Sequence, residues 1–199
     1  MRRIWLAFVV AALPCAAGAF SYSEGVSGDL SGDRLAPTAL VAALGSNSLS
    51  GSTIQGDLEY LRITFRAASS SRRSCSTRSR STDDLAFIAV QQGTTFTVTP
   101  LTATASALLG YAHFGSGLGA GGATVGNDML DDMGVAAFAI GFVPPLGASD
   151  YTFWIQQTGT QAFAYSLNFA VVPEPGTFAL LGLGLLALVW TRRAPGSVR

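Results

Sequence analysis

The sequence predicts an all-β fold: an antiparallel β-sandwich of about seven or more strands, flanked by an N-terminal signal helix and a C-terminal transmembrane helix. Two observations predict the body. Apolar side chains alternate with small or polar ones in several short segments, and turns containing glycine or aspartate separate these segments. A third observation, an apolar run at each end of the chain, predicts the two flanking helices.

The clearest strand is residues 161–172, in which large apolar side chains alternate with small or polar ones with a period of two. Residues 151–156 alternate in the same way, and the short segment 158–160 predicts a hairpin turn between the two strands. Alanine enrichment at residues 39–44 leaves a helix open as an alternative there. The other predicted strands are residues 58–65, 85–91, 95–102, 107–114 and 135–143.

Residues 1–19 have the three parts of a secretory signal peptide: two arginines, an apolar run and a cleavage site of small residues. Ala17 and Ala19 form that site, so cleavage is predicted before Phe20. The alternative is a lipoprotein signal at Cys15, which the proline before this cysteine disfavours. The exported body is accordingly predicted to span residues 20–171.

Residues 172–199 form a second signal with three parts in a set order. The second part is an apolar run at residues 177–190. As an α-helix, which rises 1.5 Å per residue, this run would be about 21 Å long, shorter than the bilayer core of about 30 Å. The arginines that follow predict a cytoplasmic tail, with a simple membrane anchor as the alternative interpretation. The three parts are Pro173, Glu174 and Pro175, then residues 177–190 as the transmembrane segment, then Arg192 and Arg193.

This C-terminal order closely resembles the PEP-CTERM sorting signal of Gram-negative bacteria. The resemblance implies recognition by an exosortase, a membrane transpeptidase, with cleavage near the Pro-Glu-Pro motif. It also implies transient anchoring in the inner membrane, followed by a place at the cell surface or outside the cell. The family is associated with extracellular polysaccharide and biofilm, so extracellular polysaccharide is an expected partner.

The body resembles the pre-peptidase C-terminal-like β-sandwich that often precedes such tails. Three segments carry this resemblance: residues 56–61, residues 150–156 and the last strand. Glu59 stands where that family usually has a second aspartate in a Gly-Asp-x-Asp-like strand start. The resemblance implies a fold and assigns no activity.

Charge and cysteine content exclude several function classes. Apart from an arginine-rich segment at residues 66–81, the body has two arginines against eleven acidic residues, which argues against nucleic-acid binding. After removal of the signal peptide Cys75 is the only cysteine, so neither an intramolecular disulfide nor a cysteine-ligated metal site is expected.

The arginine- and serine-rich segment at residues 66–81 interrupts this pattern, because it is basic and has no apolar periodicity. Three interpretations stay open. The segment is a disordered loop, a basic patch for anionic glycans, or the product of a compensated frameshift in the gene that replaced a strand.

No catalytic centre is apparent, and the protein is not predicted to be an enzyme. His113 is the only histidine, and no nucleophile elbow accompanies it. No cofactor is expected, with Ca²⁺ as the alternative, because acidic residues gather in turns and supply the hard oxygen ligands that Ca²⁺ prefers. Turn and helix capping explains the same acids equally well. The first candidates for a metal site are Asn127, Asp128, Asp131 and Asp132, and Asp29 with Asp33 forms a second acidic group.

Together these observations predict an exported, non-enzymatic protein of the cell envelope or extracellular matrix. The alternative is a Ca²⁺- or carbohydrate-binding module at the cell surface. Trp154 bears on the carbohydrate alternative, because an aromatic ring on an exposed strand face can stack on a sugar. Core packing on both strand faces explains the same tryptophan.

Overall fold

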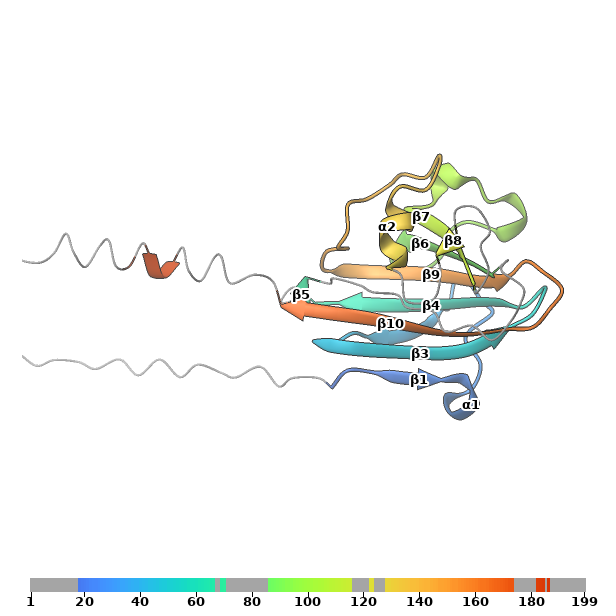
Figure 1. Ribbon diagram of the computed structural model, residues 1–199, viewed down its shortest axis with the longest axis horizontal. Coiled ribbons are helices and arrows are strands. Elements are labelled where there is room, and N and C mark those ends of the chain that lie inside the picture. The colour runs from blue at the N-terminus through green and yellow to red at the C-terminus, as the bar shows by residue number, and fades with distance from the viewer. Residues whose placement is uncertain are drawn as a thin grey trace, which may run out of the picture.

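The computed structural model describes residues 18–66, 69–70, 86–115, 122–123, 128–173, 182–184 and 186. Most elements in these ranges are β-strands, and they form two sheets (Figure 1). One sheet has four strands in the order β1-β3-β10-β5, and the other has six in the order β2-β4-β9-β6-β7-β8.

The four-stranded sheet is built around one long antiparallel pair. β10 pairs with β3 from Phe163 opposite Thr53 to Val171 opposite Gly45. At one edge β1 runs parallel to β3, and at the other β5 pairs with the end of β10. The bounds are β1 (Ser21–Ser23), β3 (Gly45–Thr53), β5 (Ser69–Ser70) and β10 (Phe163–Pro173), and the short helix α1 (Glu24–Ser27) follows β1.

The six-stranded sheet has an antiparallel centre, in which β9 pairs with β4 on one side and with β6 on the other. At the two edges of this sheet, β2 pairs with β4 and β8 pairs with β7, both in parallel. β1 pairs in parallel with β3 at the edge of the other sheet. The prediction of wholly antiparallel sheets is therefore wrong at these three edge strands. The bounds are β2 (Thr38–Val41), β4 (Leu58–Phe65), β6 (Ala86–Gln92), β7 (Gly110–Phe114), β8 (Gly122–Ala123) and β9 (Ser149–Gln157), and helix α2 (Met129–Gly134) precedes β9.

A shared apolar core connects the two sheets. The rings of Phe153 on β9 and Phe169 on β10 meet with their centroids 5.5 Å apart, and the ring of Phe114 on β7 meets that of Phe163 on β10 at 5.4 Å. The alternation predicted for the last strand is confirmed, because every second side chain is buried in this core. These side chains are Phe163, Tyr165, Leu167, Phe169 and Val171.

A second apolar cluster covers the outer face of the six-stranded sheet. Residues 93–109 cross this face, and Phe96 from this segment packs edge-on against Trp154 of β9. The strand predicted at 95–102 is wrong, because this range contains no strand and ends in the 3-10 helix η1 (Pro100–Thr102). A second 3-10 helix, η2 (Ala105–Ala107), follows it. Since Trp154 is only 3% exposed, β9 is buried on both of its faces.

The predicted hairpin between the last two long strands is also wrong. β9 belongs to the six-stranded sheet and β10 to the four-stranded sheet, so residues 158–162 carry the chain from one sheet to the other. A short turn after an alternating strand is compatible with both arrangements. Only the pairing partners distinguish them, and these are distant in sequence: β4 and β6 for β9, and β3 for β10.

Three further segments differ from what the sequence suggested. Residues 39–44 begin in strand β2 and are not helical. Residues 135–143 form no strand, and this loop exposes Val135, Phe138, Ile140 and Val143. Strand β3 was not predicted, because Gly45–Thr53 is rich in serine and glycine and its one large apolar side chain is the buried Leu49.

The predicted terminal helices and the arginine-rich segment lie mainly outside the described residues. Within the described part of the chain, no helix has the length and apolar character needed to cross a membrane. Of residues 66–81, only Arg66 and the two residues of β5 are described. At the predicted start of the body, the Phe20 amide donates a hydrogen bond of 3.1 Å to the Asn47 side chain.

Candidate functional site

Three carboxyl groups converge at one end of the core. Glu24, Asp29 and Glu59 each offer one carboxylate oxygen, and these three atoms all lie within 4.8 Å of one another. The residues come from α1, from the segment after α1 and from β4. We call this group the acidic cluster.

Glu59 occupies an inward position on β4. It is in phase with Leu61 and Ile63, which are both buried in the core between the sheets, so its side chain also points inward. The residue is 0% exposed. Its Oε2 accepts a hydrogen bond from the Tyr165 hydroxyl group of β10, whereas its Oε1 is buried without any hydrogen-bond partner.

Glu24 reaches the cluster from the start of α1, across strand β3. Its Oε2 accepts a hydrogen bond of 2.8 Å from the Ser52 amide. Gly51 provides the space for this approach, because a Cβ atom there would lie 2.5 Å from the Glu24 carboxyl group and 2.6 Å from the Tyr165 hydroxyl oxygen. Any side chain at position 51 would therefore displace Glu24 or Tyr165.

Asp29 is positioned by the residues that follow it. Leu30 is buried in the core, and the Ser31 carbonyl accepts a hydrogen bond of 2.8 Å from the Tyr60 amide of β4. These contacts hold the segment beside the beginning of β4, next to Glu59. Asp29 itself is exposed, so the cluster extends from the buried end of the core to the surface.

Burial, together with neighbouring carboxylate charges, raises the pKa of Glu59 and of Glu24. Burial raises the pKa of Glu59 to about 9 from an ordinary 4.5, and the charges of Glu24, Asp57 and Asp29 add to the rise, while the Tyr165 hydrogen bond opposes it. Burial also raises the pKa of Glu24, against hydrogen bonds from the Ser52 and Leu30 amides that lower it. The pKa of the Tyr165 phenol lies well above its ordinary value because of burial and the neighbouring Glu59, so the phenol remains a hydrogen-bond donor.

The raised pKa of Glu59 predicts a pH-dependent stability in the absence of divalent cations. Between pH 4.5 and about 9 the folded protein retains a proton on Glu59 that the unfolded chain releases. The free energy of unfolding should therefore fall as pH rises through this window, by at most about 1.4 kcal/mol per pH unit from this group. Urea unfolding in EDTA at several pH values measures this slope.

Glu59→Gln is the matched variant, because glutamine has the shape of a protonated glutamate and does not titrate. The variant should lose the part of the slope that Glu59 contributes, so its stability relative to the wild type should increase with pH. Parallel stability curves for the two proteins would show that Glu59 does not retain a proton in this window. The ionisable groups that act on Glu59 are Glu24, Asp29 and Asp57 through their charges and Tyr165 through its hydrogen bond.

The arrangement can bind either protons or a hard cation. Carboxylate oxygens are the ligands that Ca²⁺ and Mg²⁺ prefer, and the Tyr165 hydroxyl group fixes the orientation of the innermost one. Of the residues predicted as a second acidic group, Asp29 belongs to this cluster and Asp33 does not. The Asp33 side chain instead accepts a hydrogen bond of 2.8 Å from the Leu35 amide, as a turn-capping aspartate does.

The structure places the first predicted metal ligands elsewhere. Asp128 is the N-cap of α2, and its Oδ1 accepts a hydrogen bond of 3.0 Å from the Leu130 amide. Asp131 and Asp132 lie exposed in the first turn of the same helix, and Asn127 lies outside the described residues. Asp128 therefore caps α2, and Asp131 and Asp132 lie near the positive end of the helix dipole.

Sequence reasoning did not assemble the acidic cluster, although one signal was present. Glu59 is a charged residue at an inward position of an apolar strand, in phase with Leu61, Ile63 and Phe65. A buried carboxylate at such a position requires a partner. The partners Glu24 and Tyr165 are far from it in sequence, and no local pattern points to them.

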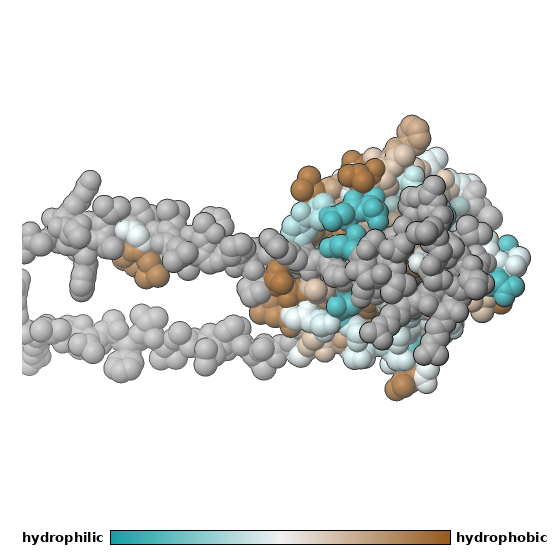
Figure 2. All heavy atoms as spheres, viewed as in Figure 1, coloured by the Kyte–Doolittle hydropathy of each residue, from teal (hydrophilic) through white to brown (hydrophobic). Residues whose placement is uncertain are grey.

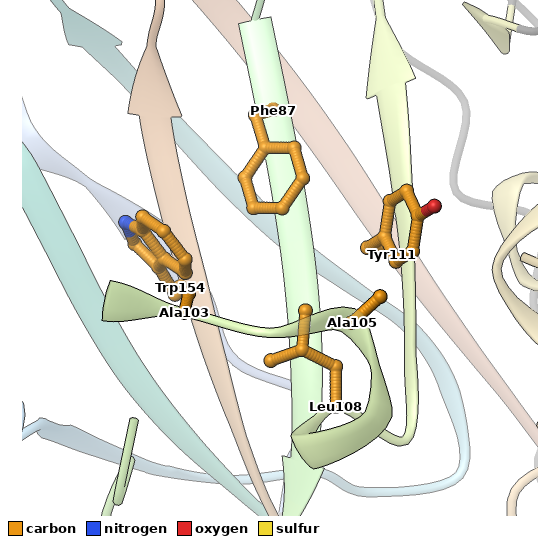
Figure 3. Close-up of a pocket in the computed structure, with 6 residues that line it drawn as sticks. All are labelled: Phe87, Ala103, Ala105, Leu108, Tyr111 and Trp154. Carbon is orange, nitrogen blue, oxygen red and sulfur yellow. The ribbon is translucent and has the colours of Figure 1, made fainter. Parts of the chain in front are cut away.

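An aromatic pocket lies on the outer face of the six-stranded sheet (Figure 3). Its cavity volume is about 170 Å³, below the roughly 300–1,000 Å³ of most small-molecule sites. The Trp154 indole nitrogen is turned away from Tyr111 in this view, and the Tyr111 hydroxyl group donates to the Ala137 carbonyl. The pocket is lined by Phe87, Ala103, Ala105, Leu108, Tyr111 and Trp154.

This pocket does not present the exposed platform that the carbohydrate alternative requires. Trp154 packs edge-on against the rings of Phe87 and Phe96, with centroids 5.0 and 5.7 Å away. His113, on β7, also contacts Phe87 through its ring, at 5.4 Å. His113 lies opposite Phe87 in the pairing of β7 with β6, so it is a strand residue.

The residues of the two predicted sorting signals are mostly outside the described ranges. Pro173 is described and is the last residue of β10, where it pairs with Ser69. Ala19 is described and exposed. The predicted signal residues outside the described ranges are Ala17, Glu174, Pro175, Arg192 and Arg193.

Comparison with known proteins identifies the C-terminal end of the chain. Residues 171–193 match the PEP-CTERM protein-sorting motif, and this match begins within β10 and includes the Pro-Glu-Pro sequence and both following arginines. No curated protein and no solved structure matches the chain, and the resemblance of the body to the pre-peptidase C-terminal-like family has no support from these comparisons. The chain therefore carries a PEP-CTERM sorting motif, which supports sorting of the protein by an exosortase and its export to the cell surface or beyond.

Proposed function

We propose that this protein is a non-enzymatic component of the cell surface or extracellular matrix with a structural or adhesive role. An exosortase delivers it through its C-terminal signal, after transient anchoring in the inner membrane by residues 177–190. The observation that carries the proposal is the sorting motif at residues 171–193, which continues directly from the last strand of a β-rich body.

The arrangement of the body suits attachment or release at one end. β10 leads into the sorting motif at the end of the body from which β1 starts, and α1 lies at the opposite end (Figure 1). We infer that the two sheets with their shared core form a β-sandwich, a compact unit that such a tail can present. Glu24 of the acidic cluster belongs to α1, so the cluster lies at the end of the body opposite to the end of β10 (Figure 1).

An exposed apolar loop supports an adhesive role. Val135, Phe138, Ile140 and Val143 are between 68% and 88% exposed. Apolar surface lies along the upper edge of the body in Figure 2, where Figure 1 shows the loop that follows α2. Contiguous exposed apolar side chains are typical of surfaces that contact other molecules. Extracellular polysaccharide and neighbouring surface proteins are the proposed matrix partners.

Mass spectrometry of both protein termini after fractionation of the native host tests this function. We expect an N-terminus at Phe20, a C-terminus near Pro173 to Pro175, and recovery of the body outside the inner membrane. Replacing Pro173, Glu174 and Pro175 together with alanine should leave the C-terminus unprocessed and retain the chain in the inner membrane.

The matched control replaces three residues of the exposed loop, Val135, Phe138 and Val143, with alanine. These side chains lie outside the sorting motif, so processing should be unchanged. An intact Arg199 on the wild-type protein in the inner membrane would contradict sorting, and the tail would then be a simple anchor. Turnover of a glycan or peptide by the purified wild-type protein would contradict the non-enzymatic role.

A further inference from the structure

The acidic cluster has a feature that hydrogen bonding within the protein does not explain. Glu59 is 0% exposed, yet its Oε1 is buried without a hydrogen-bond partner. The neighbouring charges that act on it are all carboxylates, those of Glu24, Asp57 and Asp29. A buried carboxyl group normally has a cation or a full set of hydrogen-bond donors beside it, because leaving it unpaired is costly.

We propose that Glu24, Asp29 and Glu59 bind a divalent cation, Ca²⁺, at the end of the core. Oxygen ligands lie 2.3–2.6 Å from Ca²⁺, so two ligands of one ion are at most about 5 Å apart. The three carboxylate oxygens all lie within 4.8 Å of one another, which satisfies this limit. Glu59, whose Oε1 has no hydrogen-bond partner, supplies the innermost ligand, and the exposed Asp29 leaves room for water on the outer side of the ion.

The surrounding residues orient these ligands. The Tyr165 hydroxyl group donates to Glu59 Oε2 and lies 3.5 Å from Glu24 Oε1. The Ser52 amide holds Glu24 Oε2, and Gly51 provides the space that the Glu24 carboxyl group occupies. A ligand set already held in place by hydrogen bonds needs little rearrangement when the ion binds.

The ion would join parts of the chain that are distant in sequence. Glu24 and Asp29 belong to the N-terminal segment, and Glu59 belongs to the six-stranded sheet. The N-terminal segment contributes β1 to the edge of the four-stranded sheet. Ca²⁺ would therefore fasten this edge to the opposite sheet after export, in a compartment where Ca²⁺ is available at the concentrations that extracellular sites require.

Calcium titration of the full-length protein tests the proposal. The protein is purified in detergent, stripped with EDTA and titrated with CaCl₂ by isothermal calorimetry and by thermal unfolding. We expect one site with a Kd on the order of 10⁻⁴–10⁻³ M and a melting temperature that rises with Ca²⁺ concentration. MgCl₂ should bind more weakly, because Mg²⁺ demands a tighter octahedral site.

Two variants link binding to the cluster. Glu59→Gln keeps the side-chain shape and removes one charged ligand, so it should weaken Ca²⁺ binding at least about tenfold. Gly51→Ala places a Cβ atom where the Glu24 carboxyl group lies and should also weaken binding. The control for the second variant is Gly147→Ala, because position 147 has open space around it.

Asp131→Asn and Asp132→Asn are the controls for charge, since both residues are exposed on α2. They should leave the Ca²⁺ affinity unchanged. The proposal is overturned if Ca²⁺ does not raise the melting temperature of the wild type, or if the α2 variants lose binding while Glu59→Gln retains it. Tighter binding of Mg²⁺ than of Ca²⁺ would overturn the choice of ion. Failure here would leave the sorting of the protein unaffected, because the termini report on sorting independently.

Discussion

Replacing Phe169 with alanine is expected to lower the free energy of unfolding by about 3–5 kcal/mol. Phe169 lies on β10, is 2% exposed, and contacts the rings of Phe153 on β9 and Phe20 at the start of the body. Its removal takes away the transfer free energy of a large side chain and leaves a cavity between the two sheets. Urea unfolding followed by tryptophan fluorescence measures the loss.

Phe138→Ala is the matched control for this prediction. Phe138 is 88% exposed on the loop after α2, so the same substitution there should change the stability by less than about 0.5 kcal/mol. Equal losses in the two variants would contradict the shared core, because a phenylalanine at the surface has little packing to lose.

The second large effect is expected at Asn47, a buried polar residue on β3 that is 0% exposed. Its Oδ1 accepts hydrogen bonds from the Phe20 and Ala43 amides, and its Nδ2 donates to the Ala43 and Phe169 carbonyls. Alanine at this position leaves several backbone groups without partners, at about 1–3 kcal/mol for each buried group. We therefore expect Asn47→Ala to destabilise the protein by at least about 3 kcal/mol.

Asn168→Ala tests the specificity of that effect. Asn168 lies opposite Ser48 across the β3–β10 ladder, and its side chain accepts a hydrogen bond from the Ser46 hydroxyl group at an exposed position. Water can replace that partner, so the change should stay within about 0.5 kcal/mol. If Asn47→Ala is as mild as Asn168→Ala, the Asn47 side chain does not hold the start of the body against β3 and β10.

Strands with a strong period-two pattern were predictable from the sequence. The predicted strand at 58–65 coincides with β4, and the predicted strands at 85–91, 151–156 and 161–172 lie within one to two residues of β6, β9 and β10 at each end. Each contains apolar side chains that recur at every second position. That local pattern is sufficient, because the pleat itself sends alternate side chains to opposite faces.

Weakly patterned segments were predicted less well. β3 has mainly serine and glycine and becomes a central strand because β10 and β1 pair with it on either side. Residues 95–102 alternate as a strand does, yet they cross the outer face of a sheet with Phe96 buried against Tyr60 and Trp154. In both segments tertiary packing overrode the local preference.

The sequence by itself determined the destination of this protein, the inward face of β10 and the mainly β character of the body. The sorting motif is a contiguous segment, and strand periodicity is a local property, so both are visible without a structure. Only the tertiary structure decided which sheet each strand joins and where the acidic cluster forms. Glu24, Asp29 and Glu59 meet because strand pairing and burial of Leu30 bring separate segments together, and such non-local contacts leave no pattern in any one segment.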